Sequence, residues 1–224
     1  MISNFISIFS NSGMTLPEKI LYLLIYVSCI LFSLIIHECA HGWVALKCGD
    51  PTAKIMGRLT LDPRKHLDPI GTICMLFMRI GWAKPVPINP NNFRNYRRDY
   101  ILVSFAGIAV NFLIFLITTF FAVIARMNAK AEWVVYVYQF LLILGQMNLC
   151  LAVFNLLPVP PLDGYRLLDQ IVFRGRLNMS RQMMQYIQIG FLVVCVSGLL
   201  NGLLSTVIGT VYGGVFNFFV GILH

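Results

Sequence analysis

Long, largely apolar runs separated by polar connections dominate the chain. Residues 20–36 form the first run, and residues 101–125 and 134–157 form two more, each with almost no charged side chains. A helix needs about 20 such residues to cross a hydrocarbon core of roughly 30 Å. The pattern therefore predicts an all-α polytopic membrane protein in which these runs are transmembrane helices.

Two weaker apolar regions extend this prediction. Residues 70–80 would form a helix only about 16 Å long, so we expect a re-entrant or interfacial segment there. Residues 186–200 and 205–223 are separated by Asn201-Gly202, a pair typical of turns. They predict two short spans or one hairpin that dips into the membrane, which gives about five to six transmembrane or re-entrant helices in total.

The connection between the first two runs contains closely spaced prolines. Pro85, Pro87 and Pro90 lie within residues 81–92, and proline disfavours helix interiors and central strands. We expect a small extended or β-hairpin segment here. A stiff surface loop would explain the same prolines.

The composition agrees with a membrane protein, and the charge distribution orients it. Hydrophobic residues make up 58% of the 224 residues, against roughly 45–50% in soluble domains. The net charge is +8, and of the 17 Lys and Arg, ten lie in residues 47–98 and four in residues 166–181. These basic connections indicate the cytosolic side of a multi-pass protein of the cell's inner (plasma) membrane. The lipid bilayer is the expected partner of such a surface, and no basic-aromatic face suggests nucleic acid.

The first apolar run continues without a helix breaker into His37-Glu38-Cys39-Ala40-His41. An H-E-x-x-H sequence in a helix places two imidazoles on one face, where both can bind one zinc ion, and the Glu can take a proton from metal-bound water. Cys39 points away from that face. His37 and His41 could instead be satisfied by hydrogen bonds at the helix end, but ionisable groups next to a membrane span are costly and usually functional.

A catalytic zinc site needs a third protein ligand, which must come from elsewhere in the chain. Asp163 follows three closely spaced prolines at the end of the third run, on the same side of the membrane as His41. The same Asp could instead cap a helix that starts at residue 164. His66 lies between prolines in the first polar connection, and we expect it to be a structural loop residue.

Three motifs occur together in the chain: the H-E-x-x-H sequence, Gly107-x-x-x-Asn111 and Asn155-x-x-Pro158-x-x-Pro161-Leu162-Asp163-Gly164. Together they resemble the site-2 protease family of intramembrane zinc metalloproteases, in particular its compact bacterial members without a PDZ or CBS domain. The resemblance covers roughly residues 31–164.

The resemblance implies a role for each motif residue. His37, His41 and Asp163 would bind zinc. Glu38 would act as the general base, and Asn155 would contact the substrate backbone near the scissile carbonyl. An Asn amide suits that role because it can donate to a developing oxyanion without adding charge to a low-dielectric site. The implied activity is hydrolysis of peptide bonds within or near the transmembrane segment of a single-span membrane protein or peptide.

The second run departs from the family pattern at one position. The family usually has Pro after the motif glycine, whereas Ile108 follows Gly107 here, which affects the expected helix geometry and not the catalytic assignment. We expect Asn111 to make an interhelical hydrogen bond rather than to act in catalysis. The chain is interpreted as one membrane domain, with a catalytic core at about residues 20–173 and C-terminal helical segments at residues 186–223.

Two other functions fit the same composition. A membrane ion or proton transporter could use buried His and Asp side chains, although it would have no need for the Glu beside His37. A non-catalytic membrane scaffold would bind partners without cutting them, but the complete set of ligands and base argues against it. The sequence contains no motif that indicates the substrate, the pathway or the oligomeric state.

Overall fold

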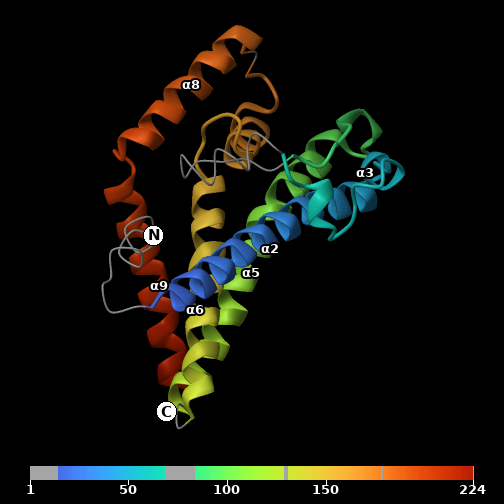
Figure 1. Cartoon of the computed structure of the whole chain (residues 1–224). Coiled ribbons are helices and arrows are strands. Elements are labelled where there is room, and N and C mark those ends of the chain that lie inside the picture. The colour runs from blue at the N-terminus through green and yellow to red at the C-terminus, as the bar shows by residue number, and fades with distance from the viewer. Residues whose placement is uncertain (1–14, 69–83, 129–130, 178, 224) are drawn as a thin grey trace.

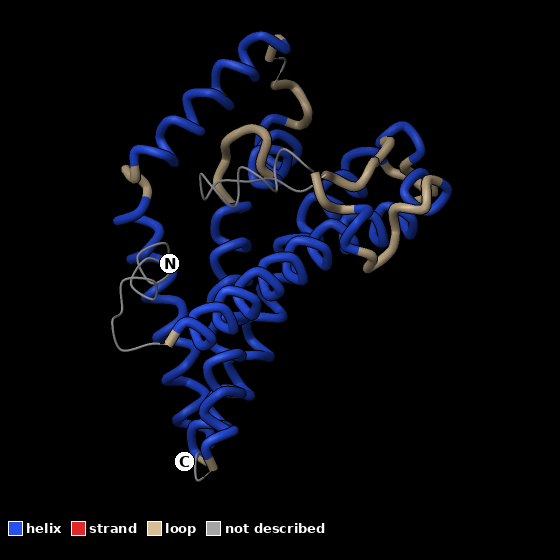
Figure 2. The backbone as a smooth tube through the Cα atoms, viewed as in Figure 1, coloured by secondary structure: helices blue, strands red, loops and turns tan. Residues whose placement is uncertain are grey.

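The computed structural model describes residues 15–68, 84–128, 131–177 and 179–223, and the structural statements below refer to these ranges. Within them the chain consists of helices joined by loops (Figure 1 and Figure 2). The elements are α2 (Leu16–Cys48), α3 (Thr52–Ile55), η1 (Pro63–Lys65), η2 (Pro90–Asn92), α5 (Tyr96–Met127), α6 (Glu132–Asn155), α7 (Asp163–Leu168), η3 (Asp169–Phe173), α8 (Arg181–Ser197) and α9 (Asn201–Leu223).

Four of the described helices are long and apolar enough to cross a membrane, namely α2, α5, α6 and α9. This confirms the prediction of an all-α polytopic membrane protein. The β-hairpin is not confirmed, because residues 84–89, called the extended segment below after the sequence prediction, form no described strand and residues 90–92 form η2. The predicted re-entrant segment, residues 70–80, lies outside the described residues, as do residues 81–83.

Helix α5 is the centre of the bundle. It packs against α2, α6, α7 and α9, and in Figure 1 α2 crosses α5 and α6 obliquely while these two run alongside each other. Small and polar residues allow the close approach. A Cβ added at Gly145 of α6 would lie 2.8 Å from Oγ1 of Thr118 on α5, and Nδ2 of Asn148 on α6 donates to Oγ of Ser33 on α2 at 2.8 Å.

The buried carboxylate of Asp50 fixes the extended segment against the end of α2. Helix α2 ends at Gly49, whose φ of 110° lies in the left-handed region that favours glycine. Asp50 then accepts hydrogen bonds from the backbone N–H of Asn89 at 2.7 Å and from the side-chain amide of Asn92 at 2.8 Å, and it also bonds Thr52. Burial raises the pKa of Asp50, but these hydrogen bonds outweigh it and hold the pKa below its usual value.

The prolines after α6 end that helix, as predicted, and return the chain to the bundle. A Cβ at Gly164 would lie 2.3 Å from the carbonyl oxygen of Leu156, so only glycine lets the start of α7 lie directly on the end of α6. Helix α7 packs on α5. Asp163, the first residue of α7, is thereby placed at the interior of the bundle, where it is buried.

The C-terminal helices break at a different residue from the one predicted. The prediction of a turn at Asn201-Gly202 is wrong, because Asn201 already begins α9. The chain turns instead at Gly198, which adopts a left-handed φ of 77° and ends α8. Helix α9 contacts α5 and α6, whereas α8 leans away from them (Figure 1).

Candidate metal centre

The two histidines of the H-E-x-x-H sequence lie on the buried face of α2. His37 and His41 are only 5% and 4% exposed, and their rings meet edge to face with centroids 4.6 Å apart. Residues four apart in a helix are neighbours on its surface, so the sequence spacing alone brings the rings together. Their Nε2 atoms are 3.0 Å apart.

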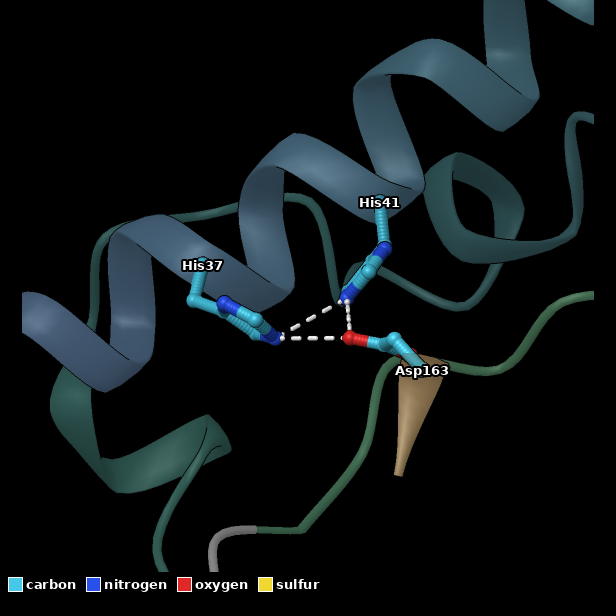
Figure 3. A group of neighbouring side chains, drawn as sticks. All are labelled: His37, His41 and Asp163. Carbon is cyan, nitrogen blue, oxygen red and sulfur yellow. Dashed lines mark hydrogen bonds and ion pairs between the residues drawn. The ribbon is translucent and has the colours of Figure 1, made fainter. Parts of the chain in front are cut away.

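Asp163 closes a triangle of donor atoms with these two nitrogens. Its Oδ2 lies 3.1 Å from Nε2 of His37 and 3.0 Å from Nε2 of His41, and the three side chains point toward one another from two separate elements (Figure 3). The other oxygen, Oδ1, faces the partly exposed Arg166 at 3.5 Å. Burial raises the pKa of Asp163, but the hydrogen bonds to His37 and His41 outweigh it and hold the pKa well below its usual range.

The triangle has the dimensions of one face of a tetrahedral zinc site. Zinc binds imidazole nitrogen and carboxylate oxygen at about 2.0–2.2 Å, which puts neighbouring ligand atoms roughly 3.3 Å apart. The observed separations of 3.0–3.1 Å differ from this by only a few tenths of an ångström. Two imidazole nitrogens and one carboxylate oxygen are also a ligand set that zinc favours, so these residues fit the metal.

The structure does not show Asp163 as a helix cap. The N-cap of α7 is Leu162, and no side chain makes a capping hydrogen bond there. The carboxylate of Asp163 faces the histidines instead of the backbone of its own helix. The capping alternative is therefore wrong.

Helix α5 packs directly against both imidazoles. The carbonyl oxygen of Val103 lies 2.7 Å from Nδ1 of His41, and the side-chain amide of Asn111 lies 3.1 Å from Nδ1 of His37. Gly107 lies between them, and a Cβ there would come within 2.5 Å of Cε1 of His37 and of Nε2 of His41. The rings fit against α5 only because Gly107 has no side chain.

Glu38 lies beside the triangle and is attached to the extended segment. Its Oε2 accepts a hydrogen bond from the backbone N–H of Val86 at 2.8 Å. The segment is held in place around this bond, since Lys84 donates its N–H to the His66 carbonyl at 2.8 Å and Arg58 donates to the Lys84 carbonyl at 2.9 Å. This hydrogen bond restricts the orientation of the Glu38 carboxylate.

The remaining candidates have other partners. Asn155 donates its amide to the carbonyl oxygen of Leu151 at 3.0 Å, one turn earlier in α6. His66 is buried and its Nε2 lies 2.7 Å from the Thr60 carbonyl, which agrees with a structural loop residue. Cys39 donates its thiol to the same carbonyl at 3.2 Å, away from the histidines as predicted.

Two contacts of the site were not predicted. The carbonyl of Val103 and the N–H of Val86 are backbone groups, so no side-chain type in the sequence indicates them. The role of Gly107 had a signal, because it belongs to a Gly-x-x-x-Asn motif, but the motif does not say which atoms approach the glycine.

A buried triangle of metal-binding donors, next to a glutamate and among helices long enough to cross a bilayer, is typical of an intramembrane metallopeptidase. Residues 121–197 match the profile of peptidase family M50. "Putative zinc metalloprotease YwhC" of Bacillus subtilis is 44% identical over 173 residues, which cover 76% of this chain and 79% of that protein.

More distant relatives carry similar names. "Putative zinc metalloprotease Rip2" of Mycobacterium tuberculosis is 32% identical over 62% of this chain and 54% of its own length. "Zinc metalloprotease MJ0392" of Methanocaldococcus jannaschii is 28% identical over 75% of this chain and 38% of its own length. No solved structure matches the chain significantly. The chain belongs to peptidase family M50, the site-2 protease family, which confirms the resemblance stated from its motifs.

The close approach at Gly107 generates the first prediction. We expect Gly107→Ala to lower the zinc content of the protein by on the order of tenfold or more, because the new methyl group would displace the imidazoles from the positions in which they could bind metal together. The measurement is zinc per protein after purification in detergent. Gly209→Ala in α9, where a Cβ meets nothing within 4 Å, is the control and should match the wild type. A Gly107→Ala protein with full zinc would show that the rings have more room than the structure gives them.

Proposed function

We propose that this protein is an intramembrane zinc metalloprotease that hydrolyses a peptide bond in or near the transmembrane segment of a single-span membrane protein. The observation that carries the proposal is the triangle of His37, His41 and Asp163, with its sides of 3.0–3.1 Å and with Glu38 adjacent in the same helix. Membership of peptidase family M50 and the names of the relatives support the same chemistry.

The residues of the centre have separate tasks in this mechanism. His37, His41 and Asp163 would hold zinc, which supplies a Lewis acid and lowers the pKa of bound water to about 7. Glu38 takes the proton of the attacking water on the oxygen that does not bond Val86, and later passes it to the leaving amine. The Val86 N–H restricts rotation of the Glu38 carboxylate. The carboxylate is therefore already oriented before the proton is transferred, and less entropy is lost in reaching the transition state.

Asn155 and the extended segment are proposed to act on the substrate. One N–H of the Asn155 amide is used by the Leu151 carbonyl, and a primary amide has a second N–H that can donate to the oxygen of the scissile carbonyl. Residues 84–89 form no described helix or strand, and Val86 among them bonds Glu38. An unwound substrate could pair with them through main-chain hydrogen bonds.

We place the protein in the inner (plasma) membrane with the metal centre toward the cytosol. The support is the charge distribution, because the basic connection at residues 47–98 follows α2 directly after the histidines, and basic connections are kept on the cytosolic side. Substrate would then be cut near the cytosolic end of its span.

The Glu38 side chain separates this proposal from an ion or proton transporter that uses the same buried His and Asp. We expect Glu38→Gln to keep its zinc and to lose on the order of 10²–10⁴ in the rate of peptide cleavage, the usual contribution of a general base. The measurement pairs metal analysis with cleavage of a panel of single-span peptides by purified protein, with and without a chelator.

Two histidine variants control this test. His41→Ala should lose both zinc and cleavage, whereas His66→Ala should keep its zinc, because the His66 ring bonds the loop carbonyl of Thr60. Cleavage at the wild-type rate by Glu38→Gln would remove the proposed base, and full zinc in His41→Ala would show that the metal lies elsewhere.

The need to unwind a helical substrate predicts how its sequence affects the cleavage rate. A helical substrate hides its carbonyls, so it must unwind locally before attack, and Gly or Pro near the cut lowers that cost by up to about 1 and 3 kcal/mol respectively. Replacing such residues one at a time by Leu should slow cleavage while the cut stays near the cytosolic end, as mass spectrometry of the products would show. Rates indifferent to these changes would contradict the unwinding step.

A further inference from the structure

Asn111 is a fully buried polar residue in the middle of α5, directly behind one of the metal-binding imidazoles. It is 0% exposed, and its Nδ2 lies 3.1 Å from Nδ1 of His37. Its Oδ1 has no hydrogen-bond partner in the described part of the chain. A buried amide oxygen without a partner is costly, so the orientation of this amide needs an explanation.

The chemistry of His37 decides which atom of the amide should face it. An imidazole that binds zinc through Nε2 carries its hydrogen on Nδ1, and this N–H requires an acceptor. The NH₂ group of Asn111 cannot accept a hydrogen bond, whereas its Oδ1 can. The two ends of an amide are nearly identical in shape and are assigned from the hydrogen-bond network. Turning the amide over brings Oδ1 to Nδ1 of His37 without moving any other group.

His41 already shows the arrangement that this turn would give to His37. Its Nδ1 lies 2.7 Å from the carbonyl oxygen of Val103, which can only accept, so Nδ1 of His41 must be the donor and Nε2 is left free for metal. Val103, Gly107 and Asn111 follow one another at intervals of four along one face of α5. The same face therefore gives an acceptor to each imidazole, with the glycine between them.

We infer that Asn111 is a positioning residue of the metal centre: its Oδ1 accepts the Nδ1 hydrogen of His37, which fixes the tautomer and the direction of the ring and so tightens zinc binding. This inference rests on the proposed function, since it presumes that His37 binds zinc. It goes beyond the interhelical hydrogen bond expected for Asn111, because the bond acts on a ligand and not only on the packing of α5 against α2.

The experiment measures the zinc dissociation constant of the full-length protein in detergent, by competition with a chromogenic chelator. Asn111→Leu removes the acceptor at nearly constant volume and should weaken zinc binding by about 10- to 100-fold, the usual effect of losing a partner of a ligating histidine. Asn111→Asp keeps an acceptor oxygen at the same place. Its zinc dissociation constant should therefore stay within about threefold of the wild-type value. If Asn111→Leu does not fold, Asn111→Ala tests the same loss.

Asn148 supplies a matched control. It is also 0% exposed, also has an Oδ1 without a partner among the described residues, and also joins another helix to α2, through Ser33. Asn148→Leu should therefore perturb packing to a similar degree, yet leave the zinc affinity within about threefold of the wild type.

The outcomes distinguish this inference from the proposed function. The inference is overturned if Asn111→Leu binds zinc as tightly as the wild type. It is also overturned if Asn148→Leu loses as much zinc affinity as Asn111→Leu, or if Asn111→Asp fails to restore binding. Asn111 would then serve packing alone. If the wild type itself binds no zinc, the proposed function fails first.

Discussion

The convergence of three donor atoms inside a helical bundle is the constraint on which the rest of the structure depends. Two of them, on His37 and His41, come from one helix, but the third, on Asp163, is far away in the sequence and is a carboxylate that is costly to bury. Both imidazoles contact the carboxylate oxygen in the structure, and a zinc ion held by the three side chains would offset that cost. The features around the site follow from this requirement. The prolines end α6, Gly164 lets α7 return onto the end of that helix, and Gly107 leaves room for the rings.

Helix α5 connects this requirement to the fold, because one of its faces contacts both imidazoles and its other faces pack on α6, α7 and α9. Glu38, the proposed base, is placed by a second set of contacts. Asp50 holds residues 89 and 92 at the end of α2, and the same segment gives the Val86 N–H to Glu38. The proposed ligands are thus positioned by helices within the bundle, whereas the proposed base is positioned by a segment beside it. A substrate that pairs with that segment would contact the element that orients the base, which couples substrate binding to the alignment of Glu38.

The sequence predicted those features that depend on periodicity or on residue type. Apolar run length predicted the spans now seen as α2, α5 and α6, and the H-E-x-x-H spacing predicted that His37 and His41 share a face. Asp163 needed the resemblance, since its spacing fitted a helix cap equally well. Backbone contacts, such as the Val103 carbonyl behind His41, have no side-chain signature. The break between α8 and α9 was misplaced because Gly198 and Asn201-Gly202 are both turn signals, and only the left-handed conformation of Gly198 distinguishes them. The hydrogen bond of Asn155 to Leu151 lies within one helix and competes with the role that the family resemblance implies.

The central claim, that two imidazoles and one carboxylate hold the metal, is tested most directly by zinc K-edge X-ray absorption of the purified, zinc-loaded protein. Cys39 lies in the same helix between the two histidines, so a sulfur ligand is the clearest competing arrangement. The structure predicts only nitrogen and oxygen neighbours, at about 2.0–2.2 Å, with the outer-shell scattering of two imidazoles. A zinc–sulfur distance of about 2.3 Å, or the scattering of fewer than two imidazoles, would contradict the account.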